Sequence, residues 1–120
     1  MKPVSSADRR VVNIHAVKYR PYVFPDGTEL GDEILQLGDD RPLGVGFHIY
    51  RMPKGMTSRP HRHNGHEQFL VLEGTLIEND GTVFKPGDMV WLRDGTEHCS
   101  YAPQGCLLAV HISASETTVP

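Results

Sequence analysis

Cysteine, clustered charge and long apolar runs are all scarce in this sequence. The chain has two cysteines among 120 residues, and the spacing of Cys99 and Cys106 fits no paired metal site. We expect both to be free thiols, because a disulfide is unusual in a reducing compartment. No apolar run approaches the roughly 20 residues of a membrane helix, and residues 1–10 lack the apolar core of a signal peptide. The sequence therefore predicts a cytoplasmic protein without a membrane segment.

Basic residues are too few and too scattered to form a nucleic-acid surface. The chain has 12 Lys and Arg against 15 Asp and Glu, which gives a formal net charge of -3. Binding to a phosphate backbone requires a basic face. We therefore expect no nucleic-acid partner.

Glycine and proline, by contrast, are frequent: there are 12 and 9 of them, placed at short intervals. Between them lie runs of four to eight residues rich in Val, Ile, Leu, Phe and Tyr, which is typical of an all-β protein. The length fits one domain with one real core. We expect a single domain over residues 1–120, with a core at 11–113 and loose ends at 1–10 and 114–120.

The turn signals divide the chain into short strands, and no segment shows the periodicity of an amphipathic helix. Many short antiparallel strands favour a sandwich or a jelly-roll barrel, in which alternate residues face the interior. We expect strands at 11–14, 22–24, 33–37, 45–52, 67–72, 75–78, 82–84, 89–92 and 106–112, with another beginning at 61–63, and a loop at 93–97.

Three potential metal donors lie close together in the middle of the chain. His61 and His63 are two residues apart, so on a strand both imidazoles point to the same side. Extending the alternation across the turn at 64–65 places Glu67, Phe69 and Val71 inward as well. Histidine and carboxylate donors that converge are a set accepted by divalent transition metals.

These residues also match a family motif. The chain resembles the first motif of the cupin family in this spacing: Gly55, five residues, His61, one residue, His63, three residues, Glu67, six residues and Gly74. The second motif is present with departures: Gly81, Pro86-Gly87-Asp88 and, ten residues later, His98, with Arg93 and Ala102 replacing a usual proline and asparagine.

The resemblance implies the cupin double-stranded β-helix, a jelly-roll barrel, holding one divalent metal ion. It assigns the ligands as His61, His63, Glu67 and His98. Such donors suit Fe(II), which we favour, and also Zn, Mn, Ni or Cu. Glu67 either only ligates the metal or leaves it to act as a general base.

The second half of the chain narrows the resemblance. Four segments are similar to the cupin domain of ChrR-like anti-sigma factors: residues 78–81, 85–88, 92–98 and 105–106. Single-domain relatives of that group resemble dioxygenases that cleave diketones or aryl ketones. The chain has no Cys-x-x-Cys and no helical segment for the zinc-binding domain of a complete anti-sigma factor. We therefore expect no binding to a sigma factor.

The resulting functional hypothesis is a metal-dependent dioxygenase that acts on a small ketone or diketone. In that reaction the metal would act as a Lewis acid on an enolate or phenolate. Two alternatives remain open: a metal-bearing sensor or ligand-binding module without turnover, and a redox-neutral isomerase, lyase or decarboxylase.

The remaining candidate residues concern the cavity and the surface. Arg59 and Arg62 are either solvated charges or anchors for an anionic substrate, and His66 points away from the metal by strand parity. The apolar strand at 69–72 needs cover on both faces, which together with the family resemblance predicts a homodimer. The candidates for the wall of a substrate pocket are Phe47, Tyr50, Met52, Phe69, Trp91 and Tyr101.

Overall fold

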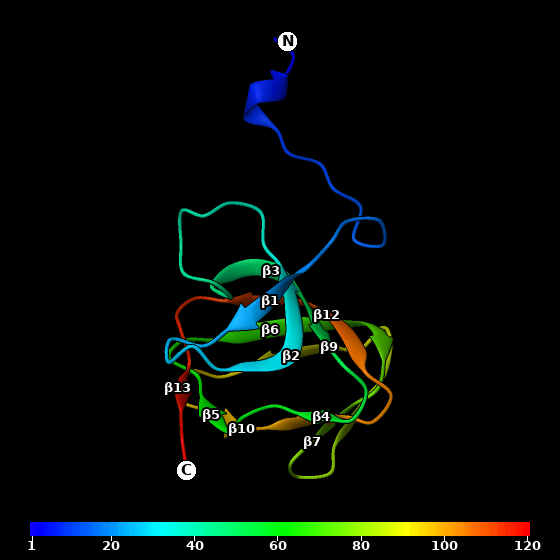
Figure 1. Cartoon of the computed structure of the whole chain (residues 1–120), viewed down its shortest axis with the longest axis vertical. Coiled ribbons are helices and arrows are strands. Elements are labelled where there is room, and N and C mark those ends of the chain that lie inside the picture. Colours follow the sequence, from blue (N-terminus) through cyan, green and yellow to red (C-terminus); the bar gives the residue numbers. More distant parts are fainter.

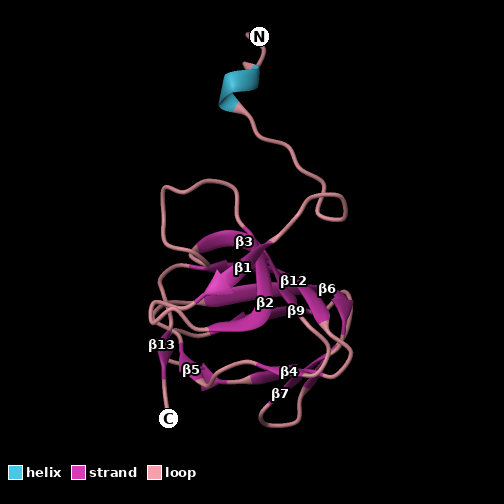
Figure 2. Ribbon diagram, in the orientation of Figure 1, coloured by secondary structure: helices cyan, strands magenta, loops and turns pink.

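The computed structural model describes all 120 residues and consists almost entirely of β-strands (Figures 1 and 2). Its only helix is one 3-10 turn at Ser6–Asp8. No helix has the length and hydrophobicity needed to cross a bilayer. The strands are β1 (Arg20–Val23), β2 (Glu29–Leu35), β3 (Gly46–Met52), β4 (Met56–Thr57), β5 (His61–Arg62), β6 (Glu67–Gly74), β7 (Leu76–Glu78), β8 (Val83–Phe84), β9 (Met89–Leu92), β10 (Glu97–His98), β11 (Ser100–Ala102), β12 (Cys106–Ile112) and β13 (Thr117–Thr118).

The strands form two layers that face each other (Figure 1). One layer is a six-stranded antiparallel sheet in the order β1-β2-β3-β12-β6-β9. The other is made of a four-stranded sheet, β4-β11-β7-β8, and a three-stranded sheet, β10-β5-β13. Non-consecutive neighbours such as β3-β12-β6 are typical of a jelly roll. The structure thus confirms the expected all-β jelly-roll fold.

The main core lies between the two layers and follows strand alternation. Phe69 and Val71 of β6 and Leu108 and Val110 of β12 point inward from the large sheet, where they join Leu76 of the opposite layer. The intervening residues of β6 point outward. The apolar strand predicted at 69–72 therefore has one face in the core, as its alternation required.

The outer face of the large sheet is partly covered by the segment before β1. Tyr19 packs with Ile49 and Leu107, and Ile14, Val17 and Leu72 lie against this second cluster. The strand expected at 11–14 is absent. Instead, the Asn13 side chain accepts a hydrogen bond from His15 N at 2.8 Å, and the Asn13 carbonyl accepts from Ala16 and Val17. Asn13 thus begins a turn, because its side chain competes for the backbone donors that a strand would use.

The two ends of the chain differ. Residues 1–10 are exposed and extend away from the barrel (Figure 1). The other end was expected to be loose from residue 114, but Thr117–Thr118 form β13 and pair with β5. This difference arises because β5 would otherwise have one unpaired edge, which β13 satisfies. The end of the chain is thereby brought beside the histidine segment.

Candidate metal centre

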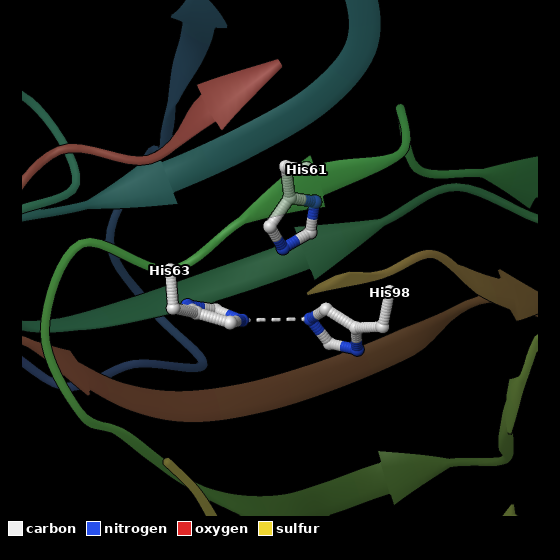
Figure 3. Close-up of side chains that lie close together, drawn as sticks. All are labelled: His61, His63 and His98. Atoms are coloured by element: carbon white, nitrogen blue, oxygen red, sulfur yellow. Dashed lines mark hydrogen bonds between the residues drawn. The ribbon is translucent and has the colours of Figure 1, made fainter. Parts of the chain in front are cut away.

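Three histidines from two adjacent strands point toward one another. His61 lies on β5 and pairs directly with His98 on β10, and His63 follows β5. Their ring centroids are separated by 4.5 Å for His61–His98, 4.9 Å for His63–His98 and 5.0 Å for His61–His63. Figure 3 shows the three rings gathered around one point. The alternation predicted for His61 and His63 is confirmed, and strand pairing adds His98.

Backbone hydrogen bonds hold His63 in place although β5 ends one residue earlier. His63 N donates to the Thr96 carbonyl at 2.9 Å, and Gly95 N donates to the His63 carbonyl at 3.0 Å. The two bonds tie His63 to the loop that leads into β10. That loop therefore positions both His63 and His98.

Glu67 completes the cluster from the opposite layer. It is the first residue of β6, and its side chain is buried. One carboxylate oxygen, Oε1, lies 3.7 Å from His63 Nε2 and 4.0 Å from His98 Nε2. The structure thus brings together all four residues that the family motifs named.

Burial controls the protonation of these side chains. Burial, together with the neighbouring His61 and His98, lowers the pKa of His63 to about 4, so the imidazole is neutral at physiological pH. Burial also raises the pKa of Glu67 well above its usual value, with Glu116 and Glu78 contributing in the same direction. A neutral imidazole has a free lone pair, which is the form that binds a metal ion.

Outer hydrogen bonds fix the orientation of two of the rings. His61 Nδ1 donates to the Arg59 carbonyl at 2.8 Å, and His98 Nδ1 donates to Glu78 Oε2 at 2.7 Å. Glu78 is itself held by the Ser100 hydroxyl. Because both Nδ1 atoms are used as donors, Nε2 of each ring is left for the centre of the cluster. Outer partners of this kind are usual around metal-ligating histidines.

Two further carboxylates in this region were missed by the sequence analysis. Glu78 shares the inward face of β7 with Leu76, so strand alternation could have found it. Glu116 lies just before β13, and its Oε2 is 3.4 Å from His61 Nε2. No sequence signal pointed to Glu116, because its segment was expected to be loose.

The donor atoms are close enough to share one ion. Those of His61, His63 and His98 lie within 4.8 Å of one another, and so do those of His63, Glu67 and Glu116. Imidazole nitrogen with carboxylate oxygen is a donor set that suits first-row transition metals. This cluster of histidine and glutamate residues is therefore able to bind a metal ion.

His61, Glu67 and His98 of the cluster line a cavity of about 650 Å³ between the two layers. Tyr50, Met52 and Phe69 line this cavity, together with His48. The prediction was wrong for the other three wall candidates, which point outward and are exposed by 62% for Phe47, 52% for Trp91 and 41% for Tyr101. Side chains alternate between the two faces of a strand, and in each of these three strands the residue after the candidate, such as His48 after Phe47, faces inward.

Part of the cavity wall is polar. Asp32 is 2% exposed and accepts a hydrogen bond from the Tyr50 hydroxyl through Oδ2, while its Oδ1 has no partner. Burial raises the pKa of Asp32 and raises that of Tyr22, on the same wall, to about 12. Ionising either side chain in the folded protein therefore costs free energy.

The arginines and the remaining histidine occupy different positions. Arg59 lines the cavity, where it pairs with Asp26 at 3.5 Å and stacks over Phe24 at 4.3 Å. Arg62 is exposed and lies 3.9 Å from Glu97. His66 lies outside the cluster and accepts a hydrogen bond from Asp94 N at 3.0 Å, as its strand parity predicted.

Both cysteines are free, as expected. Cys106 is buried, and burial raises the pKa of its thiol to about 11. A thiol with so high a pKa is neutral at physiological pH and therefore inert as a nucleophile.

The fold is shared with solved structures of low sequence identity. An RmlC-like cupin protein from Ralstonia eutropha JMP134 superposes with a TM-score of 0.74 at 13% identity, over 92% of this chain and 72% of that one. An acetylacetone dioxygenase from Acinetobacter johnsonii superposes with a TM-score of 0.72 at 17% identity, over 100% and 83%. For the Rhodobacter sphaeroides complex of SigE with the anti-sigma ChrR the values are 0.62 and 22%, over 88% of this chain and 51% of that one.

The family assignment rests on the sequence as well as on the fold. No curated protein matches the sequence. The family described as the ChrR Cupin-like domain, however, matches residues 7–116, a range that contains every residue of the histidine and glutamate cluster. With its jelly-roll barrel and the cluster on the wall of the cavity, the chain belongs to the family of ChrR cupin-like domains.

Proposed function

We propose that this protein is a metal-dependent dioxygenase that cleaves a small ketone or diketone. The observation that carries the proposal is the position of the histidine and glutamate cluster: His61, His98 and Glu67 line a cavity of about 650 Å³, and His63 lies next to them. That volume is in the range of small-molecule sites. A donor cluster that opens into a cavity is suited to chemistry on a ligand, whereas a structural metal site is closed.

The proposed ligands are His61, His63, Glu67 and His98, with one ion per chain. Fe(II) is the favoured metal, and the bound ion would supply Lewis acidity and reactivity toward dioxygen. The Arg59 carbonyl and Glu78 orient two of the rings. Glu67 contributes a carboxylate oxygen or, once displaced, accepts a proton from the substrate.

The remaining cavity wall would select the substrate. Met52, Phe69 and Leu108 present apolar surface, which favours a ketone or an aromatic molecule over a sugar acid. Arg59 is already paired with Asp26, so its charge is partly neutralised before any anion arrives. The superposition with the acetylacetone dioxygenase adds support from a shared fold.

Oxygen uptake by the iron-loaded protein tests the proposal. We expect protein loaded anaerobically with Fe(II) to consume oxygen and acetylacetone in equal amounts once air is admitted. His63→Ala should abolish both uptake and tight iron binding. His15→Ala is the matched control, since His15 is exposed and lies outside the cluster, and it should retain both. Iron-loaded wild type that consumes no oxygen with any diketone or aryl ketone would contradict the dioxygenase.

A second candidate function is a metal-bearing sensor without turnover. The family match and the superposition with the anti-sigma ChrR favour it. A sensor of this kind would hold redox-silent zinc tightly, and a small ligand in the cavity would change its affinity for a protein partner. Metal analysis of protein purified without added ions separates the candidates, because iron that reacts with oxygen supports the enzyme and zinc supports the sensor.

We also propose that the protein is a homodimer formed through the outer face of the large sheet. Phe47, His111, Gln68 and Trp91 are successive register partners across β3, β12, β6 and β9. All four are exposed, and the row has an aromatic ring at each end. An exposed row that ends in two large aromatic side chains, on a continuous sheet face, is a surface that a second copy of the chain would cover.

A further inference from the structure

We propose that Glu116 is a fifth protein ligand of the metal, held there by a strap of residues 113–119 that is fastened along β5. The proposal rests on the metal-binding function proposed above. It concerns a residue outside both cupin motifs, on a segment that the motifs do not reach.

The position of the Glu116 carboxylate carries the proposal. Its Oε2 lies 3.4 Å from His61 Nε2, and the carboxylate is within 4.8 Å of donor atoms of both His63 and Glu67. Two ligands bound to one ion at about 2.1 Å are separated by roughly 3 to 3.5 Å, depending on coordination number. The separation from His61 Nε2 therefore already matches a shared ion.

The strap is tied down along its length. Thr117 and Thr118 pair with Arg62 and His61, and Val119 N donates to the Pro60 carbonyl at 3.0 Å. Figure 1 shows β13 beside β5 at the end of the chain. Glu116 is therefore placed by a backbone ladder to the same strand that carries His61.

Asn64 and Gly65 provide the second attachment. The Asn64 side-chain amide donates to the Ser115 carbonyl and to Thr117 Oγ1, both at 2.8 Å. A Cβ atom on Gly65 would lie 2.0 Å from Ser113 Oγ, so glycine there allows the strap to pass closely. Asn64 thus holds Ser115 and Thr117, the two residues that flank Glu116.

A cation would also relieve a conflict between charges. Glu67 and Glu116 both place a carboxylate oxygen within 4.8 Å of a His63 nitrogen, and the negative charge of one carboxylate disfavours a charge on the other. A divalent ion bound between them offsets that repulsion. If five protein residues held the ion, fewer positions would be left for a substrate, and a substrate that binds through two oxygens would compete with one of these residues. Glu116, on a strap at the edge of the barrel with a side chain 30% exposed, is the ligand best placed to leave.

A zinc-affinity measurement on matched charge-removal variants tests the proposal. Wild type, Glu116→Gln and Glu97→Gln are titrated with Zn(II) in competition with a chromophoric chelator. Glu97 is the control, because it is an exposed glutamate next to His98 that faces away from the cluster. We expect Glu116→Gln to bind zinc at least about tenfold more weakly, in the range found when a metal-site partner is removed, and Glu97→Gln to bind as wild type does.

Two further readouts separate ligation from a merely structural role. With Co(II) in place of zinc, the visible absorption bands should change in Glu116→Gln and stay unchanged in Glu97→Gln, since only the first removes a donor. Asn64→Ala, which releases the strap without removing a donor, should also weaken zinc binding while the metal-free protein keeps its unfolding temperature.

The outcomes distinguish this proposal from the one on which it rests. Wild type that binds no divalent metal would overturn the metal-binding function itself. Wild type that binds zinc, with Glu116→Gln equal to it in affinity and in cobalt spectrum, would overturn only the role of Glu116.

Discussion

Among single residues, burial has the largest effect on the pKa values of Asp32 and Tyr50 in the cavity wall. Asp32 is almost fully buried, and its closest partner is the hydroxyl of Tyr50, another residue of the cavity wall. Burial raises the pKa of both groups, and the charge of Asp32 raises that of Tyr50 further. A buried carboxylate depends on such a donor, because without one it loses its solvation and gains nothing in return.

Removing the Tyr50 hydroxyl should therefore destabilise the protein. We expect Tyr50→Phe to lower the free energy of unfolding by about 1–3 kcal/mol, the cost of leaving a buried polar group unsatisfied. Burial keeps Asp32 protonated to a higher pH in the folded state than in the unfolded state. The penalty should thus be larger at neutral pH than in mild acid, because the Tyr50 hydroxyl stabilises the charged form of Asp32 more than the protonated form.

Urea denaturation at the two pH values measures this effect. Tyr101→Phe is the matched control, because Tyr101 is exposed and points away from the cavity. An equal penalty for both substitutions would show that the Tyr50 hydroxyl contributes nothing to Asp32.

Among the secondary-structure elements, two very short strands position two of the three clustered histidines. β5 and β10 have two residues each, yet they place His61 and His98 opposite one another. The segment 93–97 was expected to be a loop, and Glu97 instead begins β10. Such short strands are stable here because each is joined to a neighbour on β13, β5 or the loop before β10, and none forms alone.

The pairing of β6 with β12 depends on a glycine at its end, where Gly74 is the register partner of Cys106. Gly74 has φ +78, and a Cβ atom there would lie 2.1 Å from the Gly105 carbonyl oxygen. We expect Gly74→Ala to destabilise the fold by more than Gly81→Ala. Gly81 also has positive φ but nothing within 4 Å of its Cβ position, so alanine there costs only the conformational strain of about 1–2 kcal/mol.

The free energies of unfolding of the two glycine variants are compared in urea. Gly74→Ala requires movement of the backbone of β12 in addition to the strain, so its midpoint should fall further. A Gly74→Ala protein as stable as Gly81→Ala would mean that the two strands separate at little cost.

In the molecule as a whole, the outer face of the large sheet is covered only in part. The inner faces meet in one core that surrounds the cavity. On the large sheet, the segment with Tyr19 covers one part of the outer face, and the row from Phe47 to Trp91 remains exposed. The expected homodimer would cover that second part.

A charge placed in the exposed row should separate the subunits. We expect wild type to have twice the mass of one chain by size exclusion with light scattering, and Trp91→Glu to have the mass of one chain, since a buried unpaired charge is costly. Val83→Glu is the control, because Val83 is exposed on β8 of the other layer, and it should leave the dimer intact. A wild-type monomer would refute the dimer.

The sequence by itself determined those features that depend on local spacing. Alternation along a strand placed His61 and His63 on one side and turned Glu67, Phe69 and Val71 inward, and the structure has all five there. The motif also supplied His98, which lies far along the chain. The predictions from alternation hold because successive side chains in a strand point to opposite faces.

Only the tertiary structure decided which distant segments meet. It brought Glu116 to the histidines, placed Glu78 behind His98, buried Asp32 against Tyr50, and turned Phe47, Trp91 and Tyr101 outward. Each of these positions depends on the register between strands and on the path of the chain after β12. Register is set by how whole faces of the sheets pack, and a shift of one residue exchanges the inner and outer faces of a strand. Composition and local spacing do not contain that information.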